Sequence, residues 1–305
     1  TTGSWANFEN PDFKLVSINT TRFDVTKHQA TPVISDAKIG IMELSMALGD
    51  WKAPNLWFER ACKERSEWDA YVGKQSGPTN RELPTYAHAV GAVYRNADPS
   101  DIVVTAAGGL VGEVVQIWKP KQRNTFETEW GFSCMGYEIS GALGIKMAKP
   151  DQDVIVFIGD GSYLLANSDI YSSVIYHKKL IIIVCDNGGH MVINRLQLAK
   201  GGKEYICNLR AARATNLQFV DFESHAKSMG ANGETVSSTS DLEAAFLRAK
   251  KSDKTYVISL KTDGYEWLEG TSFWESPTSE IHSNEENKKA YSDFIKGKKK
   301  QRKGV

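Results

Sequence analysis

Two short polar motifs each follow a run of apolar residues, and together they could bind a divalent cation. Gly159-Asp160-Gly161 follows one apolar run, and Asn187 follows the next. Twenty-five residues separate Gly161 from Asn187, and their pattern predicts one amphipathic helix between two buried strands. Because the strands of a right-handed βαβ unit run parallel, Asp160 and Asn187 are expected at the same carboxyl edge of a sheet.

The oxygen atoms of these side chains suit magnesium. A carboxylate oxygen and an amide oxygen are hard ligands of the kind that Mg²⁺ prefers, and phosphate oxygens commonly complete its shell. The glycines let the backbone approach a phosphate, and Ser162 follows where the free N–H groups of a helix N-terminus favour an anion. The alternative is an ordinary turn with an aspartate, which leaves Asn187 unexplained. The motif therefore predicts a site for Mg²⁺ and a phosphorylated ligand.

Alternating strand and helix patterns predict the scaffold that positions this site. They indicate an α/β fold, a doubly wound parallel sheet. The predicted elements are helix 85–94, strand 102–105, a helix opened by Gly108 and Gly109, helix 136–148, strand 153–158, strand 180–186, helix 223–229, strand 234–236, helix 241–251 and strand 256–260.

The first seventy or so residues form a separate small group of elements. Their pattern predicts strands at 14–18 and 33–34 and helices at 36–48 and 55–72. So few elements cannot bury much core by themselves, which indicates the end of a larger α/β domain. The Gly- and Pro-rich stretch 73–84 is typical of a domain boundary. We therefore expect three segments, which are 1–74 with a linker helix, 75–262 with the cation site, and 263–305 as a C-terminal extension.

Composition excludes several classes of partner. The 305 residues contain 37 basic and 37 acidic side chains, so no overall field draws the chain to nucleic acid or a membrane. Basic residues crowd the last ten positions, which indicates a solvated, frayed terminus or, alternatively, a binding arm. Four widely spaced cysteines predict reduced thiols in a cytoplasmic protein. No apolar run is long enough to predict a membrane span.

The Gly-Asp-Gly to Asn spacing resembles the diphosphate-binding signature of thiamine-diphosphate enzymes. The resemblance implies thiamine diphosphate and Mg²⁺ as cofactors and a small molecule as substrate. It implies that the side chains of Asp160 and Asn187 and the backbone carbonyl of Gly189 hold the metal. It also implies that Gly159, Gly161 and Ser162 lie against the diphosphate.

Two further segments resemble the same family. Gly131-Phe-Ser-Cys-Met-Gly136 is similar to the segment whose methionine wedges the cofactor into a V shape, a role that the resemblance carries to Met135. An ordinary core methionine is the alternative. Ala106 to Gly112 is similar to the loop that binds the far end of the diphosphate, which implies contacts from Gly108, Gly109 and Leu110.

His190 follows the predicted metal loop. An imidazole at this position could act as a general acid or base, or it could simply make a local hydrogen bond. We name His190 as the candidate catalytic residue. The other five histidines stand on unremarkable predicted helices or loops, and we expect them to be structural.

The finer resemblance is to the trihydroxycyclohexanedione hydrolases of myo-inositol degradation rather than to acetolactate synthases. It rests on 105–110, on 210–213 before 219–222, and on the tail 273–281 with Ala290-Tyr291. It implies that water opens a cyclic 1,2-diketone to 5-deoxyglucuronate. The loop 187–191 departs from the commoner Asn-x-Gly-aromatic pattern. This departure affects the substrate contacts that the resemblance implies more than the metal ligands.

The family also implies a missing partner. A glutamate on a pyrimidine-binding domain activates the cofactor across a subunit interface, and no segment here is similar to that domain. We therefore expect the C-terminal part of a larger enzyme, inactive alone, that works in a homodimer or tetramer. The alternatives are an acetolactate-synthase-like carboligase or decarboxylase, and a non-catalytic cofactor-binding subunit. A nucleotide-binding protein is disfavoured because Gly-x-Gly-x-x-Gly and Gly-Lys-Ser/Thr motifs are absent from the relevant strand ends.

Overall fold

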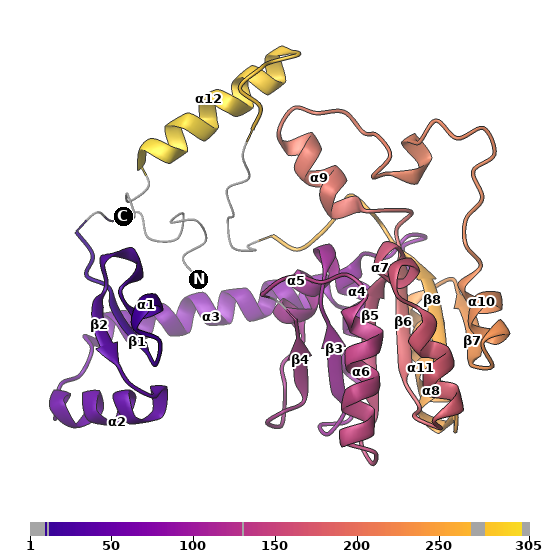
Figure 1. The fold of residues 1–305 in the computed structure, drawn as a ribbon, viewed down its shortest axis with the longest axis horizontal. Helices are drawn as coiled ribbons and strands as arrows, with labels where there is room; N and C mark the ends of the chain where they lie inside the picture. The colour runs from indigo at the N-terminus through magenta and orange to yellow at the C-terminus, as the bar shows by residue number, and fades with distance from the viewer. Residues whose placement is uncertain (1–9, 11, 130, 270–277, 301–305) are drawn as a thin grey trace. The chain divides into compact units, whose positions relative to one another are not determined.

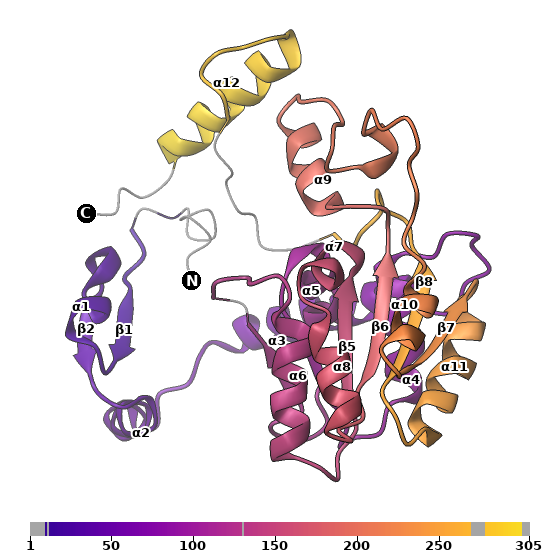
Figure 2. The same cartoon turned by 45° about the vertical axis from the view of Figure 1, so that its right-hand side comes forward.

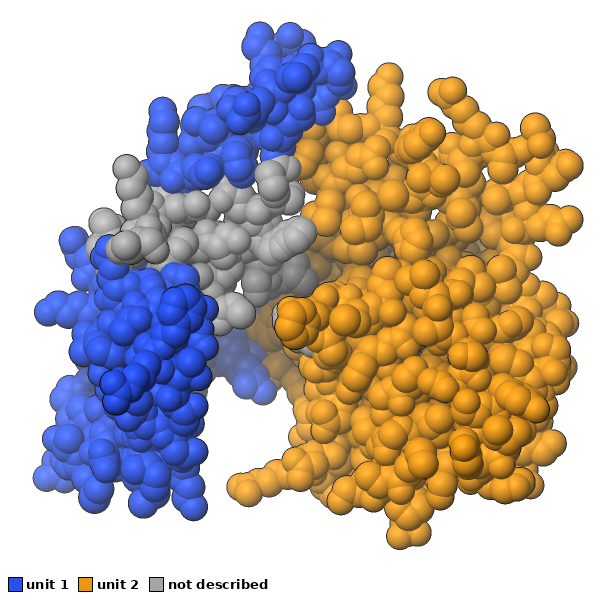
Figure 3. All heavy atoms as spheres, in the orientation of Figure 1, with its two compact units in different colours: residues 1–67, 272–305 blue, residues 68–271 orange. Residues whose placement is uncertain are grey.

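A computed structural model describes residues 10, 12–129, 131–269 and 278–300. The chain divides into two compact units, which Figure 3 distinguishes by colour. Unit 1 comprises residues 1–67 and 272–305, and unit 2 comprises residues 68–271. The predicted domain limits at 74 and 262 stay a prediction.

Unit 1 contains a two-stranded parallel sheet and several helices. Its elements are β1 (Val16–Asn19), α1 (Arg22–Val25), a 3₁₀ turn (Lys27–Gln29), β2 (Thr31–Ile34), α2 (Ala37–Leu48), the first part of α3 (Asn55–Gln75) and α12 (Glu285–Lys300). The Asp36 carboxylate caps α2 by accepting the N–H groups of Lys38 and Ile39. Met42 and Met46 on α2 are exposed, so this helix lacks a covering layer among the described residues.

The frayed terminus predicted for the last ten residues is wrong as far as Lys300, because a helix continues to that residue. α12 is a regular helix up to Lys300, and Glu285 and Glu286 in its first turn complement the helix dipole. Its basic residues are solvated, as expected, because Lys296 is exposed. Residues 273–277, 302 and 303, which also carried predictions, lie outside the described residues.

Unit 2 contains a six-stranded, entirely parallel sheet, which confirms the predicted fold class (Figures 1 and 2). The strand order is β4-β3-β5-β6-β8-β7. The strands are β3 (Ile102–Thr105), β4 (Phe126–Thr128), β5 (Val154–Gly159), β6 (Ile181–Asp186), β7 (Asn232–Val236) and β8 (Tyr256–Lys261). The three-residue strand β4 was not predicted, because so short a segment carries no clear periodicity.

Helices cover both faces of this sheet. One face packs against α4 (Tyr86–Asn96), α5 (Gly108–Ile117) and α11 (Thr239–Lys251), and the other packs against α6 (Tyr137–Ala148), α8 (Ser168–Ile175) and α10 (Phe222–Ser228). Successive residues of a strand face opposite layers, so Phe157 of β5 joins the first core while Val156 and Ile158 join the second. Burial on both faces explains why the central strands are continuous apolar runs.

The segment between β5 and β6 corrects another prediction. In place of one helix it forms α7 (Asp160–Leu165) and α8, separated by a break at Ala166 and Asn167. The Asn167 side-chain amide donates a hydrogen bond to the Tyr163 carbonyl at 3.2 Å, which satisfies a carbonyl at the end of α7. Gly136 from another loop lies against Ala166, since a Cβ on that glycine would be 2.5 Å from the Ala166 Cβ. The break therefore makes room for that loop.

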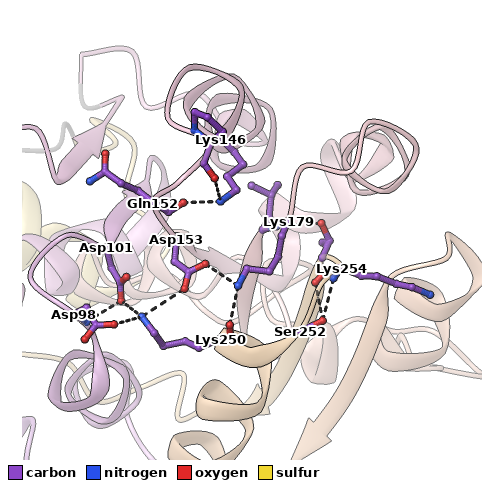
Figure 4. A network of polar contacts seen from close by, with 12 residues as sticks. Asp98, Asp101, Lys146, Gln152, Asp153, Lys179, Lys250, Ser252 and Lys254 are labelled. Carbon is purple, nitrogen blue, oxygen red and sulfur yellow. Dashed lines mark hydrogen bonds and ion pairs between the residues drawn. The ribbon is translucent and has the colours of Figure 1, made fainter.

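A network of ion pairs joins the amino ends of the strands (Figure 4). The Lys250 ammonium lies 2.6 Å from Asp101, 2.8 Å from Asp98 and 3.5 Å from Asp153. Lys179 also pairs with Asp153 at 2.7 Å. Asp101 and Asp153 immediately precede β3 and β5, so these pairs bind α11 to the edge of the sheet opposite the predicted site.

Candidate functional site

The two predicted motifs do meet at the carboxyl edge of the sheet. Asp160 begins α7 directly after β5, and its Oδ2 accepts the Gly189 N–H at 2.7 Å. Gly188 and Gly189 follow β6 with φ values of +81° and +142°, which favour glycine. A Cβ on Gly189 would lie 2.4 Å from the Cys207 carbonyl oxygen, so the loop has no space for a side chain. The predicted metal ligands therefore belong to two directly hydrogen-bonded loops.

The Asn187 amide has one satisfied end and one open end. Its Nδ2 donates to the Tyr86 hydroxyl at 2.6 Å, while its Oδ1 is buried with no hydrogen-bond partner among the described residues. Asn187 is only 4% exposed, and an unpaired buried oxygen costs about 1–3 kcal/mol. A cation at Oδ1 would remove this cost. Tyr86, which orients the amide, could not be recognised from sequence because it lies far upstream on α4.

Burial also disfavours charge on Asp160, which is 5% exposed. This burial raises the pKa of Asp160 to about 7, and the neighbouring carboxylate of Asp186 adds to the rise. The N–H groups of Gly189 and Gly161 oppose it. A divalent cation reverses such an effect, because its own charge favours the carboxylate.

Two basic residues stabilise the predicted metal loop, which comprises residues 187–189, and neither was predicted as a site residue. Lys261, at the end of β8, forms an ion pair with Asp186, whose Oδ1 accepts the Gly188 N–H at 3.0 Å. Arg210 donates to the Asn187 carbonyl at 3.4 Å. The Phe219 ring faces both cations, at 5.6 Å from the Arg210 guanidinium carbon and 4.9 Å from the Lys261 ammonium. Arg210 and Phe219, one from each of the stretches 210–213 and 219–222, thus lie beside the loop that follows β6.

The remaining residues of the Gly-Asp-Gly motif contact neighbouring loops. Gly159 ends β5, where a Cβ would lie 3.8 Å from the Tyr86 hydroxyl. A Cβ on Gly161 would lie 2.6 Å from Cε1 of His190, so the exposed imidazole lies directly against this glycine. Ser162 is buried, and its Oγ accepts the Gly136 N–H at 2.8 Å.

Met135 and the start of α5 complete the set of predicted residues. Met135 is partly exposed, and the next residue, Gly136, has a φ of +93°. Gly108 begins α5 with a φ of +79° and is exposed, while Gly109 is half-buried. Leu110 lies in the hydrophobic core, so only its backbone could contact a ligand. These loops follow β4 and β3, and they lie at the same edge of the sheet as Asp160.

A cavity of about 30 Å³, room for one or two water molecules, lies beside the metal loop. Its lining includes Tyr86, Glu113, Asn187 and Arg195. The Arg195 guanidinium lies 3.7 Å from the centre of the Trp267 ring. Burial lowers the Arg195 pKa, and burial raises the Glu113 pKa to about 7. The same cavity is therefore lined by Asn187 of the candidate site and by the poorly solvated carboxyl group of Glu113.

Residues 106–260 match the family model of the C-terminal thiamine pyrophosphate-binding domain of thiamine pyrophosphate enzymes. The chain belongs to this family, whose cofactor is also called thiamine diphosphate. A 4-hydroxybenzoylformate decarboxylase from Rhodococcus jostii RHA1 shares the fold, with a TM-score of 0.53 and 21% identity over 62% of this chain and 34% of that one.

Curated relatives resemble nearly the whole chain. A 3D-(3,5/4)-trihydroxycyclohexane-1,2-dione hydrolase from Lacticaseibacillus casei is 34% identical over 93% of this chain and 48% of its own length. The Halalkalibacterium halodurans and Bacillus subtilis hydrolases of the same description are 33% and 29% identical, each over 95% of this chain and 49% of their own lengths. The chain therefore spans about half the length of these relatives.

The donor set fits the metal that the family implies. One buried carboxylate, one unpaired amide oxygen and a backbone carbonyl are hard oxygen ligands of the kind that Mg²⁺ accepts. No group of three or more His, Cys, Asp or Glu side chains that could hold a metal occurs among the described residues. Few side-chain ligands are expected where diphosphate oxygens fill the other coordination positions of the metal.

Among the residues that the structure describes, no helix is long and apolar enough to cross a membrane.

Proposed function

We propose that this chain is the cofactor-binding part of a thiamine-diphosphate- and Mg²⁺-dependent hydrolase. The substrate would be trihydroxycyclohexanedione, a cyclic 1,2-diketone, opened by water to 5-deoxyglucuronate in inositol degradation. One observation carries this proposal. The similarity to these hydrolases covers 93–95% of the chain, well beyond the residues 106–260 that match the domain shared by the family.

The residues present suit distinct tasks in binding. Asp160, Asn187 and the Gly189 carbonyl would hold Mg²⁺, and the N–H groups that begin α5 and α7 would bind the diphosphate. Met135 would lie against the two rings of the cofactor, where a polarizable thioether packs well. When bound, the cofactor supplies a nucleophilic carbon and a sink for the electrons released by cleavage of a carbon–carbon bond.

His190 is the candidate for proton transfer. It immediately precedes α9 (Met191–Ala199), and its side chain is exposed beside Gly161. From this position the imidazole would exchange a proton with the substrate or with the attacking water. We retain His190 as the catalytic residue of the proposal.

A pyrimidine-binding part is the proposed partner. The curated relatives are about twice as long as this chain, and α2 of unit 1 exposes an apolar surface of the kind that a larger domain covers. We propose that this part, on the same polypeptide or on another one, completes the active site within a homodimer or tetramer in the cytoplasm.

Calorimetric titration of thiamine diphosphate in the presence of Mg²⁺ tests the cofactor site. Asp160→Asn keeps the size of the side chain but removes its charge, so we expect affinity to fall by more than the ~10–100-fold typical of residues behind a metal ligand. Asp151→Asn is the matched control, because Asp151 is exposed before the amino end of the same strand. Equal affinity of the wild type and the Asp160 variant would contradict the metal site.

A substrate panel on the chain combined with its N-terminal part tests the reaction. Release of 5-deoxyglucuronate from the dione supports the hydrolase. Consumption of pyruvate without dione hydrolysis would favour an acetolactate-synthase-like carboligase instead. Activity that appears only after a second polypeptide is added would identify this chain as a subunit of a two-chain enzyme.

A further inference from the structure

One buried carboxylate hydrogen-bonds to three separate loops of the candidate site. Glu138, in the first turn of α6, is only 1% exposed. Its Oε1 accepts the Ala107 N–H at 3.3 Å, and its Oε2 accepts the Gly136 N–H at 2.9 Å. The Ser162 hydroxyl lies 2.9 Å from both carboxylate oxygens.

These three partners belong to consecutive loops at the carboxyl edge of the sheet. Ala107 follows β3, Gly136 follows β4, and Ser162 lies in the segment after β5. The three strands are neighbours in the order β4-β3-β5. Each loop carries residues proposed to contact the cofactor, so a single side chain links all three at one point.

A carboxylate suits this role better than any other side chain. Its two oxygens can accept about four hydrogen bonds, whereas an amide side chain of the same size offers one acceptor oxygen and two donors. Hydrogen bonds to a charged acceptor are also roughly twice as strong as neutral ones. Burial raises the pKa of Glu138, while the bonds from Ser162, Ala107 and Gly136 favour its charged form.

The Ser162 hydroxyl both accepts and donates a hydrogen bond within this arrangement. It accepts the Gly136 N–H at 2.8 Å and has the Glu138 carboxylate as its acceptor. Since a hydroxyl has a single proton, Ser162 cannot also donate from its side chain to a diphosphate. Its remaining donor toward a ligand is the backbone N–H.

We propose that Glu138 is a positioning residue, whose carboxylate sets the relative placement of the three loops that bind the diphosphate and the cofactor rings. This inference rests on the proposed function for the ligand, but the hydrogen bonds themselves can be tested without it. Without the carboxylate, the loops after β3 and β4 lose the acceptor that they share. The backbone N–H groups of Ala107 and Gly136 are then no longer held in one orientation by Glu138.

Amide hydrogen exchange followed by nuclear magnetic resonance tests the positioning role on the whole chain. In Glu138→Gln, we expect exchange at Ala107 and Gly136 to accelerate by about tenfold or more, because each N–H loses a charged acceptor. The matched control is Glu223→Gln. Glu223 occupies the same second position of its helix, α10, and accepts a backbone N–H from Thr235 at 2.9 Å.

Titration of thiamine diphosphate with Mg²⁺ on the same proteins provides the second measurement. We expect the affinity of Glu138→Gln to fall by about tenfold, matching the loss of one charge-assisted hydrogen bond, and that of Glu223→Gln to stay unchanged. Unchanged exchange in Glu138→Gln, with normal cofactor binding, would overturn the role of Glu138 alone. Accelerated exchange in a series whose wild type binds no cofactor, even when combined with its N-terminal part, would instead overturn the proposed function.

Ser162→Ala keeps the test possible should Glu138→Gln fail to fold. It removes one hydroxyl and leaves the carboxylate in place. We expect faster exchange at Gly136, which loses one of two acceptors, and no change at Ala107, which does not contact the serine. Equal exchange at Gly136 in the variant and the wild type would overturn the arrangement.

Discussion

Replacing Glu113 by glutamine is expected to stabilise the folded chain at high pH and to have little effect at low pH. The side chain is 3% exposed, and its Oε2 has no hydrogen-bond partner within the described ranges. Burial raises the pKa of Glu113 to about 7, although the Leu268 and Ala87 N–H groups and the charge of Arg195 oppose the rise. Glutamine has nearly the same shape as the protonated acid and carries no charge at any pH.

The magnitude follows from proton linkage. The ordinary pKa is 4.5, so between 4.5 and about 7 the folded state keeps a proton that the unfolded state has released. The stability from this group is complete below pH 4.5 and is lost as pH rises through 7. At about 1.4 kcal/mol for each pH unit, the free energy of unfolding falls by about 3 kcal/mol over this interval. Glu113→Gln does not undergo this loss.

Urea unfolding at pH 5 and pH 8, followed by tryptophan fluorescence, measures the effect. We expect the variant and the wild type to have similar free energies of unfolding at pH 5, and the variant to be more stable by about 3 kcal/mol at pH 8. Glu82→Gln is the control, because Glu82 is exposed in the same unit. A stability difference that is the same at both pH values would refute the reasoning, since a pH-independent change cannot arise from titration.

Two other substitutions distinguish residues that affect cofactor binding from residues that affect only the stability of the fold. Gly189→Ala is expected to destabilise the chain by about 1–3 kcal/mol and to weaken Mg²⁺-dependent cofactor binding, because its φ is +142° and its Cβ would meet the Cys207 carbonyl oxygen at 2.4 Å. Urea unfolding and calorimetry measure both effects, and normal affinity in a destabilised variant would contradict the placement of this loop in the site. Lys250→Met leaves the buried carboxylate of Asp101 unpaired, so we expect a loss of about 3 kcal/mol with unchanged cofactor affinity. A weakened affinity would show that the two edges of the sheet are coupled.

The sheet and its carboxyl edge could be predicted from the sequence because their signals are local. Buried parallel strands are continuous apolar runs, and the predicted strands 153–158 and 180–186 match β5 and β6 to within one residue at each end. Polar residues directly after such runs must lie at the edge of the sheet. The placement of Asp160 beside the loop of Asn187 follows from the topology, and the structure confirms that these loops meet.

The side chains that orient the site could not be predicted, because their partners come from distant segments. Tyr86 reaches Asn187 from α4, and Lys261 reaches the metal loop from the end of β8. Glu138 looks like an ordinary charged residue in the first turn of a helix until the fold buries it. One signal was available, since it is the only acidic residue in a helix, 137–148, that is otherwise rich in small and apolar residues. The break after α7 depends likewise on Gly136 from another loop.

The contact between His190 and Gly161 has a consequence for evolution. An alanine methyl at position 161 would occupy space taken by the imidazole, 2.6 Å from Cε1 and 2.7 Å from Nδ1. A side chain at 161 therefore requires the exposed imidazole of His190 to rotate away, so the size of residue 161 and the position of this imidazole are coupled. Selection from a library randomised at both positions should recover larger residues at 161 more often in combination with small ones at 190. The glycine of the motif thus also allows the side chain of a residue in the next loop to take its observed position.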